Sequence, residues 1–483
     1  MDSLKVKFQF NDLQLEAEKG SNLLQVLLEN DVDIIHFCYH PELSCSGNCR
    51  TCVVKDLTSD TLIMACQESV DQNKKYENKS ENVVKAAQWA YEFHLVDHPL
   101  DCPVCNQNGL CELQDFSLKF NRMEKLGQHV YTWENSASAV ALTENLFFHE
   151  KRCIMCTLCV RFLDEITATH ELGIVGKGDQ AKIYPFKMLN GNNYSQNLVD
   201  LCPAGSFGRQ DYKSKFLTSS LEEVQSTCIG CDTGCAITVF QNSIGTYRVK
   251  PCFDARVNRS WMCDYGRTTI DNVSGPKRIQ NYVKNEKGKI SFFPLEEMIP
   301  FSGVSKVHVI LTCELLNEEV ETSLELLKEN KFNPLLFSWP IDPAKGDSFL
   351  MSKNKNPNYT GAEALFLQKG LVHTHLDFEQ QLGLIQETDV ILMAIPEIMH
   401  DQKYFEFILS KIRKSKLKIA MSVYDNPMFL DTFDFVLPTY SFLEKNGTSI
   451  NKQTLERKYS AGYKYSQLAK SVPEYISIFR MGK

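Results

Sequence analysis

The second half of the chain alternates short apolar runs with amphipathic segments. Five runs have the length and the branched apolar content of buried strands, namely VHVILT, PLLFSW, VILMAI, LKIAMSV and FDFVLP, which begin at residues 307, 334, 390, 417 and 433. Residues 318–330 and 402–414 place apolar side chains at helical spacing instead. Strands buried on both faces with helices between them predict a parallel sheet covered by helices.

The first residues of the chain show a different pattern. Residues 4–34 predict two alternating strands, a turn at Gly20 and a helix that opens at Ser21. With 483 residues, the chain is long enough for two to four domains. Its net charge of −8 argues against non-specific nucleic-acid binding. No run of eighteen apolar residues and no export or transit signal is recognisable, so we expect neither a membrane span nor export.

Cysteines are numerous and clustered, since fifteen of the eighteen lie between residues 38 and 235. In a large chain without an export signal, cysteines at short spacing more often hold metal than form disulfides. Their spacing separates them into four ligand sets. Cys45, Cys252 and Cys313 fall outside these sets, and we expect structural roles for them.

The first set follows the predicted strand pair and helix, in a glycine-containing loop that supplies three cysteines before a distant fourth. This arrangement resembles a plant-type [2Fe–2S] ferredoxin domain, with a first gap of ten residues in place of the usual four. The ligands implied are Cys38, Cys49, Cys52 and Cys66.

The third set is a C-x2-C-x2-C run closed by a remote Cys-Pro, which is typical of a [4Fe–4S] cube. A zinc site would need paired C-x2-C knuckles, which leaves a triple run unexplained. This set comprises Cys153, Cys156, Cys159 and Cys202. The fourth set resembles the cluster-bearing domain at the start of molybdopterin oxidoreductases such as formate dehydrogenases. It comprises Cys228, Cys231, Cys235 and Cys263.

The second set, in HPLDCPVCNQNGLC, has only three cysteines, Cys102, Cys105 and Cys111. An imidazole nitrogen can replace a thiolate on a cluster iron, as it does in Rieske centres. His98, four residues before Cys102, is the fourth ligand that we expect, and His94 is the competing candidate.

The ordered series of four sites is similar to the large iron–sulfur subunit of respiratory complex I, the proton-translocating NADH:quinone oxidoreductase. A fainter likeness to the molybdopterin-family domain lies in FDFVLPTYSFLEKNGTSIN at residues 433–451. The resemblance implies an α+β and α/β multidomain chain. Its parts are a [2Fe–2S] β-grasp ferredoxin domain (1–78), a His-Cys [4Fe–4S] segment (79–120), a [4Fe–4S] ferredoxin-like domain (140–220), a molybdopterin-oxidoreductase-type cluster domain (221–277) and a shortened, degenerate α/β domain (278–483).

This resemblance implies one [2Fe–2S] and three [4Fe–4S] clusters and no catalytic residue. The last domain has no candidate molybdenum ligand, so we expect no molybdopterin. GIVGKG at residues 173–178 lacks the Rossmann spacing and is expected to form a loop, so we assign no NAD or FMN site.

The resemblance also implies partners and a place in the cell. NADH would be oxidised at FMN on a neighbouring subunit, and this chain would relay the electrons to the next iron–sulfur subunits toward quinone. The fourth cluster would lie off the main route. We expect a bacterial subunit, peripheral on the cytoplasmic side of the inner membrane. The alternatives are an electron-transfer subunit of an NAD-linked hydrogenase or formate dehydrogenase, and a zinc-binding scaffold.

Metal content tests the four sets together. One [2Fe–2S] and three [4Fe–4S] clusters amount to fourteen irons, held by fifteen cysteines and His98. Anaerobically purified protein should contain about that much iron, with matching acid-labile sulfide and no molybdenum. Stoichiometric zinc with only a few irons would contradict the four-cluster assignment.

Overall fold

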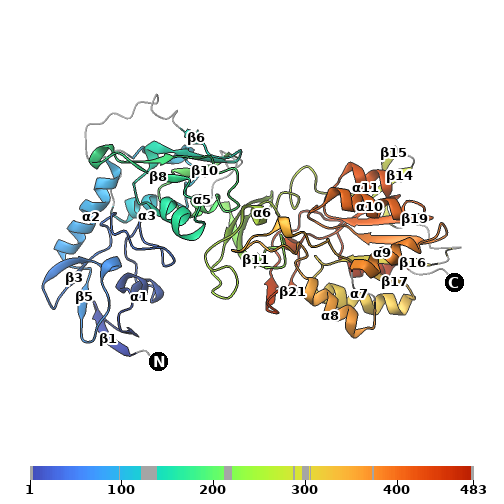
Figure 1. Ribbon diagram of the computed structural model, residues 1–483, viewed down its shortest axis with the longest axis horizontal. Helices are drawn as coiled ribbons and strands as arrows, with labels where there is room; N and C mark the ends of the chain where they lie inside the picture. Colours follow the sequence, from blue (N-terminus) through green and yellow to red (C-terminus); the bar gives the residue numbers. More distant parts are fainter. Residues whose placement is uncertain are drawn as a thin grey trace. The chain divides into compact units, whose positions relative to one another are not determined.

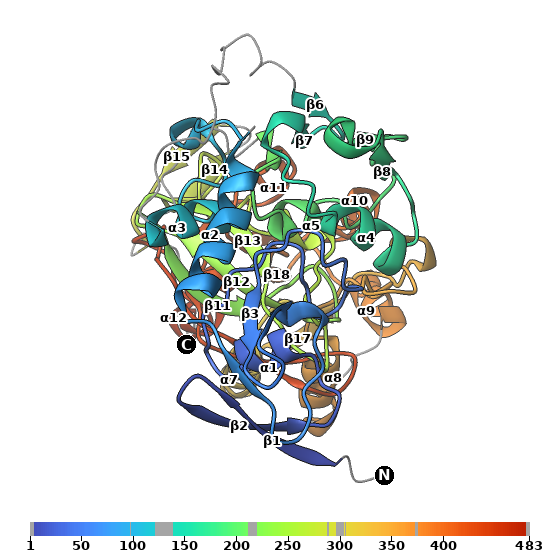
Figure 2. The same ribbon diagram turned by 90° about the vertical axis from the view of Figure 1, so that its left-hand side faces the viewer.

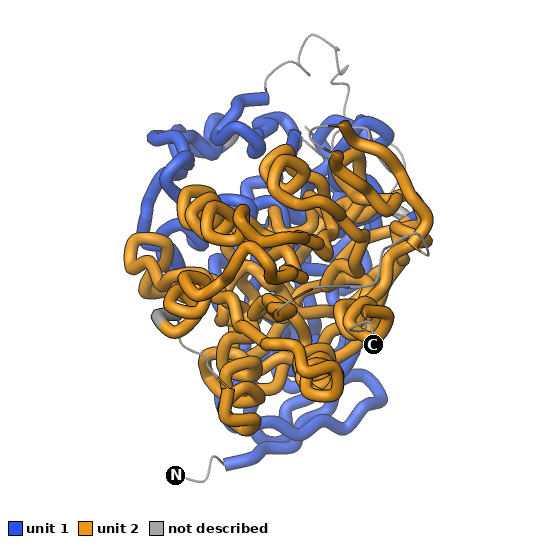
Figure 3. Tube along the Cα trace, turned by 90° about the vertical axis from the view of Figure 1, so that its right-hand side faces the viewer, with its two compact units in different colours: residues 1–220 blue, residues 221–483 orange. Residues whose placement is uncertain are grey.

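The computed structural model describes residues 4–96, 98–120, 139–210, 220–286, 289–295, 304, 306–371 and 375–479. The chain forms two compact units, residues 1–220 and 221–483 (Figure 3). Residues 211–219 of the expected third domain lie outside the described ranges. Nowhere in those ranges does a helix combine the length and apolar character needed to cross a membrane.

The first unit opens with a five-stranded sheet. Its strands lie in the order β2 (Leu13–Glu18), β1 (Lys5–Phe10), β5 (Lys75–Glu77), β3 (Val53–Asp56) and β4 (Thr61–Met64). Alternate residues of β1, including Phe8 and Phe10, pack against Leu23 and Leu27 of helix α1 (Leu23–Glu29). The two predicted strands are therefore confirmed.

Helix α1 begins two residues later than predicted. Asn22, not Ser21, is its cap, because the Asn22 Oδ1 accepts the backbone N–H of Gln25 at 3.1 Å. An asparagine oxygen satisfies one of the free N–H groups of the first turn, which sets the start of the helix.

The rest of the first unit consists of short elements around loops. It contains α2 (Glu81–Leu95), α3 (Glu112–Lys119), β6 (Ala139–Ala141), β7 (Leu146–His149), α4 (Leu158–Arg161), β8 (Leu172–Val175), β9 (Lys182–Pro185), α5 (Asn197–Leu201) and β10 (Phe207–Arg209). Within this unit, β1 and β2 lie at one end and β6 to β9 at the other (Figure 2).

The glycine-rich stretch 173–178 was wrongly predicted to be all loop. Its first three residues belong to β8, which pairs antiparallel with β9. A strand that returns as a second strand offers no helix N-terminus for a dinucleotide phosphate, unlike the Rossmann βαβ unit.

The second unit begins with a three-stranded antiparallel sheet, made of β11 (Glu222–Thr227), β12 (Ala236–Gln241) and β13 (Thr246–Pro251). The short helix α6 (Asp264–Arg267) follows. Farther along the chain, β21 (Gly447–Ile450) and β22 (Glu456–Tyr459) form a separate hairpin.

A seven-stranded sheet forms the centre of the second unit. Its order is β15 (Lys289–Phe292), β14 (Val283–Glu286), β20 (Phe435–Pro438), β19 (Leu417–Ser422), β18 (Val390–Ala394), β16 (Val307–Thr312) and β17 (Asn333–Phe337). The last five are mutually parallel and correspond to the five predicted strands. The β14–β15 hairpin adds an antiparallel edge that the apolar pattern did not predict.

Helices cover both faces of this sheet (Figure 1). One face packs on α7 (Asn317–Asn330), α8 (Tyr359–Gln368) and α12 (Val472–Ile478). The other packs on α9 (His375–Gly383), α10 (Gln402–Ile412) and α11 (Pro427–Thr432). Val309 faces the first layer and its neighbour Ile310 faces the second, as strand alternation requires. The predicted helices at 318–330 and 402–414 are confirmed as α7 and α10.

The parallel strands run outward from β16 in two directions, toward β17 on one side and toward β18 on the other. The point where strand order reverses therefore lies between β16 and β18. In open α/β sheets, ligands bind outside the carboxyl ends of the strands at such a point.

Candidate metal centres

The third ligand set forms a single cavity. Its four cysteines line this cavity together with apolar neighbours that include Ile154, Leu158 and Phe207. Met155 and Thr157 have φ angles of 54° and 61°, which bend the loop around the first sulfurs. The Met155 backbone N–H then donates to Cys153 Sγ at 3.4 Å. The four cysteines of this set are Cys153, Cys156, Cys159 and Cys202.

Burial keeps these thiols protonated. It raises the pKa of Cys153 to about 12 and raises those of Cys156 and Cys159 further. Because metal binds the thiolate, loading the cavity must release protons. The apolar lining and the directed N–H group suit an iron–sulfur cluster, whose potential depends on exclusion of water and on hydrogen bonds to sulfur.

The first set lies in the loop between α1 and β3 and in the residues after β4. Cys38 and Cys49 are close enough to shift each other's pKa, and so are Cys52 and Cys66. A hydrogen bond from Cys49 lowers the pKa of Cys38 to about 5. All four side chains are buried, so the loop and the strand end do bring this predicted set together.

The second set is arranged around the short turn at Cys102. Cys111 is buried, and burial raises its pKa to about 12, whereas Cys102 and Cys105 are partly exposed. His98 is 9% exposed. His94, the competing ligand, lies elsewhere, because its Nε2 is 2.9 Å from the backbone oxygen of Cys49 in the first set.

The fourth set is fully contained in the second unit. The Gly230 N–H donates to Cys228 Sγ at 3.3 Å, and the Gly266 N–H donates to Cys263 Sγ at 3.4 Å. Burial raises the pKa of Cys263 to about 12. All four cysteines, Cys228, Cys231, Cys235 and Cys263, are buried and close enough to influence one another electrostatically. Across the described ranges, no three His, Cys, Asp or Glu side chains converge tightly enough to hold a single metal ion.

Two contacts join neighbouring sets in the first unit. Arg161 Nη2 donates to the backbone oxygen of Cys38 at 2.6 Å and to that of Cys156 at 3.3 Å, so one guanidinium bridges the first and third sets. Cys111 Sγ donates to the oxygen of Pro203 at 3.3 Å, directly after Cys202, which connects the second and third sets. The third set is therefore in contact with both of the others.

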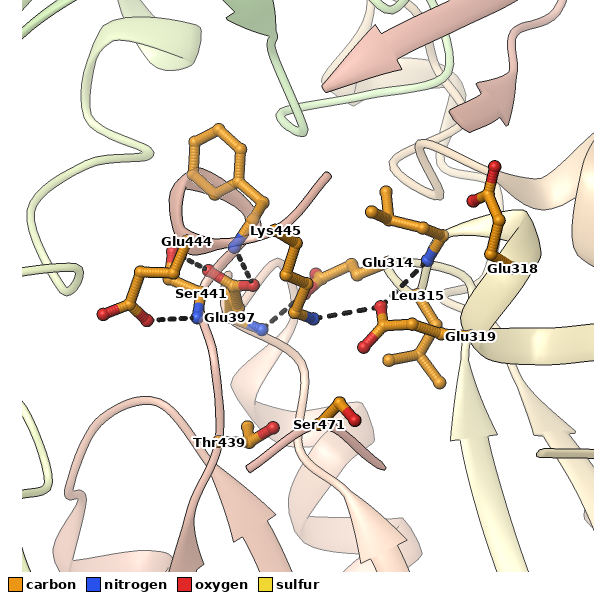
Figure 4. Close-up of polar contacts among 12 residues, drawn as sticks. Glu314, Leu315, Glu318, Glu319, Glu397, Thr439, Ser441, Glu444, Lys445 and Ser471 are labelled. Carbon is orange, nitrogen blue, oxygen red and sulfur yellow. Dashed lines mark hydrogen bonds and ion pairs between the residues drawn. The ribbon is translucent and has the colours of Figure 1, made fainter. Parts of the chain in front are cut away.

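A buried polar cluster occupies the strand-order reversal of the large sheet (Figure 4). Glu314 follows β16, and Glu397 follows β18. Glu314 Oε2 accepts the backbone N–H of Glu397, and Glu397 in turn accepts the Ser441 hydroxyl at 2.8 Å. Lys445 donates to Glu319 at 3.1 Å. Hydrogen-bonded side chains of the protein thus fill the carboxyl ends of these strands.

The two carboxyl groups of this cluster titrate far from their usual range. Burial, and after it the neighbouring Glu397, raises the pKa of Glu314 to about 8. Burial raises the pKa of Glu397 to about 7, although Lys445 and Ser441 act in the opposite direction.

The three cysteines outside the sets differ in their surroundings. Cys313 is buried directly after β16, and Cys252 is partly buried beyond β13. Cys45 is exposed, and its Sγ donates to the backbone oxygen of Cys66 at 3.1 Å. Their structural roles stay a prediction.

Comparison with known families agrees with the cysteine sets. Residues 3–81 match the model of a 2Fe-2S iron-sulfur cluster binding domain. Residues 89–125 match the NADH-ubiquinone oxidoreductase-G iron-sulfur binding region, and residues 145–208 match the ferredoxin-like domain of NADH-quinone oxidoreductase subunit 3. The chain therefore contains [2Fe–2S] and [4Fe–4S] ferredoxin-type regions, as the spacing predicted.

Curated relatives belong to NADH-ubiquinone and NADH-quinone oxidoreductases. The chain is 31% identical over 291 residues to the NADH-ubiquinone oxidoreductase 75 kDa subunit of Reclinomonas americana, which covers 60% of this chain and 41% of the relative. It is 26% identical over 369 residues to the corresponding NADH-quinone oxidoreductase subunit of Rickettsia bellii, covering 72% and 52%. This chain is a homologue of the 75 kDa subunit. The resemblance to the large iron–sulfur subunit is confirmed.

This homologue of the 75 kDa subunit spans about half the length of the curated relatives that it matches, or less. A solved NAD⁺-reducing [NiFe]-hydrogenase chain is also similar, at 21% identity with a TM-score of 0.40, over 44% of this chain and 91% of that one. A score that low establishes no shared fold.

Sequence reasoning missed the residues that join the ligand sets and fill the sheet edge. Arg161 stands two residues after Cys159, in CVRF, but nothing in that position indicates that it reaches Cys38. Glu314 and Glu397 each stand two residues after a predicted strand, and that placement near strand ends was the available signal.

The raised carboxyl pKa values predict how stability depends on pH. The folded state holds protons that the unfolded state loses above about 4.5, so stability should fall as pH rises from there toward about 8. Glu314→Gln keeps a neutral acceptor and should remove this loss, stabilising the second unit at pH 8 by about 1–3 kcal/mol. Hydrogen exchange of the backbone amides of β16 and β18, compared between the variant and the parent protein at the same pH, measures this stabilisation.

Glu325→Gln is the matched control, because Glu325 lies exposed on α7. It should leave exchange in β16 and β18 unchanged at every pH. Equal protection in the Glu314→Gln and parent proteins at pH 8 would show that the buried pair carries no such cost.

Proposed function

We propose that this chain is an electron-transfer iron–sulfur subunit of the peripheral arm of a proton-translocating NADH:quinone oxidoreductase. The observation that carries the proposal is the cavity of the third set, which all four predicted cysteines line. The [2Fe–2S] and [4Fe–4S] family matches and the homology to the 75 kDa subunit support it.

We infer one [2Fe–2S] and three [4Fe–4S] clusters, each of which would supply one-electron storage and transfer when bound. The proposed ligands are Cys38, Cys49, Cys52 and Cys66; His98, Cys102, Cys105 and Cys111; Cys153, Cys156, Cys159 and Cys202; and Cys228, Cys231, Cys235 and Cys263. The residues of the chain exclude water, direct N–H groups at sulfur and hold the loops in place.

The contacts between sets support a relay within the first unit. The second set touches the third through Cys111 and Pro203, and Arg161 ties the third to the first. Close approach of the ligand loops is what electron transfer between centres requires. In this proposal electrons arrive from FMN on a partner subunit and leave to the next iron–sulfur subunit toward quinone.

The second unit is proposed to hold a structural cluster and no molybdopterin. A molybdopterin dinucleotide carries phosphates, which are favoured by N–H groups and positive charge at the strand ends. There the chain places Glu314 and Glu397 instead, already bonded to backbone and hydroxyl groups. These bonds occupy the Glu397 backbone N–H and the Ser441 hydroxyl, two donors that a phosphate would otherwise use.

The proposed setting is the cytoplasmic face of a bacterial inner membrane, where the chain would be held by the other peripheral-arm subunits. The domain limits given by the cysteine spacing, 1–78, 79–120, 140–220, 221–277 and 278–483, belong to the same proposal. The limit at 220/221 is close to the division between the two compact units.

Replacing His98 tests the mixed ligand set. His98→Cys should retain a cube with a lower reduction potential, because thiolate donates more electron density than imidazole. His98→Ala should lose that cluster and slow NADH-to-quinone transfer. Low-temperature EPR of the reduced protein shows whether the cluster is retained in His98→Cys and lost in His98→Ala. His94→Ala is the control and should leave this cluster's signal intact, since His94 lies against Cys49; an unaltered spectrum in His98→Ala would refute the assignment.

Two cysteine variants distinguish a cluster on the electron-transfer path, the third, from a structural cluster, the fourth. Cys156→Ala should abolish turnover even in assembled complex, because it damages the set that touches both neighbours. Cys231→Ala should lower assembly and yield, since metal binding is coupled to local folding. The complex that does assemble should keep near-normal turnover per FMN. Full assembly with blocked electron flow in Cys231→Ala would place the fourth cluster on the route.

A further inference from the structure

Lys355 brings a positive charge into the buried surroundings of the fourth ligand set. The residue is only 4% exposed. Within the described part of the chain, its Nζ has no hydrogen-bond partner. Removing an ammonium group from water costs several kcal/mol unless a charge or a set of acceptors replaces the lost hydration. Among the described residues, no side-chain acceptor lies within hydrogen-bond distance of Nζ, so the position favours a nearby negative charge.

The backbone before Lys355 is fixed to the loop that carries Cys231. The Asp232 N–H donates to the oxygen of Asn354 at 3.0 Å, and the Thr233 hydroxyl donates to the oxygen of Leu350 at 2.9 Å. Asn356 accepts the N–H of Trp339 at 2.7 Å on the other side. The segment therefore holds Lys355 in place beside the ligand loop.

The groups that face the Lys355 ammonium indicate where that negative charge would lie. Its Nζ lies 5.1 Å from the centroid of the Tyr265 ring, within range of a cation–π interaction. Its charge lowers the pKa of the Cys228 and Cys263 thiols, which shows that both sulfurs are within electrostatic reach. Asp232 is the carboxyl group that it influences, but the two form no ion pair, and burial raises the pKa of Asp232.

We propose that Lys355 is the counter-charge of the fourth iron–sulfur cluster and raises its reduction potential. The inference rests on the proposed ligand set Cys228, Cys231, Cys235 and Cys263. A cube held by four thiolates is an anion, and one-electron reduction adds a further negative charge without taking up a proton. A fixed ammonium in a low-dielectric site stabilises the reduced cluster more than the oxidised one. Lys355 is a positioning residue and does not bind iron.

The proposal gives the fourth cluster a specific electronic character. Without Lys355, four buried thiolates and an apolar shell would disfavour the reduced, more negative state. With Lys355, an electron that enters this site is held more firmly. The charge on the segment around residue 355 therefore tunes a centre whose ligands come from distant parts of the chain.

The test is a redox titration of the complete, cluster-loaded chain, followed by low-temperature EPR. Lys355→Met removes the charge and keeps the length of the side chain, so the midpoint of the fourth cluster should become more negative. Lys355→Arg keeps the charge and should stay near the parent value. Lys353→Met removes a charge from the same segment at an exposed position and should shift nothing. The other three clusters serve as internal references in every sample.

The outcomes separate this inference from the cluster assignment. A fourth-cluster midpoint that is equal in Lys355→Met and parent protein, with the cluster intact, overturns the role of Lys355 alone. Parent protein that lacks four irons and this EPR signal overturns the ligand set and the inference together. If Lys355→Met loses the cluster, Lys355→Gln provides the neutral variant, and loss of the cluster there but not in Lys355→Arg supports the counter-charge.

Discussion

Burial of cysteine sulfur is the constraint on which both units depend. Removal from water makes a thiol harder to deprotonate, and burial raises the pKa of Cys111, Cys153 and Cys263 to about 12. A metal ligand must be deprotonated, so cluster binding has to displace those protons and stabilise the thiolates that result. The loops that carry the ligands have few strands or helices of their own. Under the proposed function, their folding and their cofactor content are one process.

The first unit satisfies this constraint by letting ligand loops support one another. A loop that wraps around a cluster turns its carbonyl groups outward, and buried carbonyls need donors. Arg161 supplies them to Ser44, Cys38 and Cys156 from a single guanidinium. A planar side chain with five donors suits this task better than lysine. The same contact that stabilises the loops also brings two proposed centres together.

The sequence was sufficient for everything that depends on short spacing. C-x2-C runs, the five apolar strands and the helices α7 and α10 are local patterns, and the structure and the homology agree with them. It was insufficient where partners are distant in the chain. Arg161 reaches Cys38 across 123 residues, and Lys355 lies near Cys228 and Cys263, which stand 127 and 92 positions earlier, so neither spacing nor hydrophobic pattern could reveal them. The start of α1 was misplaced because Asn22 and Ser21 are both good caps.

The second unit combines two different polar environments within one α/β domain. At the reversal of strand order, Glu314 and Glu397 occupy backbone and hydroxyl donors where such folds usually bind an anionic ligand. Beside the fourth set, Lys355 favours negative charge. Burial is the main cause of the raised pKa of Tyr265, and Glu314 and the cysteines of the fourth set add to it. Tyr265 is therefore close to both regions. A domain that had merely lost a cofactor would need neither feature. Together they suit a scaffold that rejects a phosphate-bearing cofactor yet still supports the anionic cluster beside it.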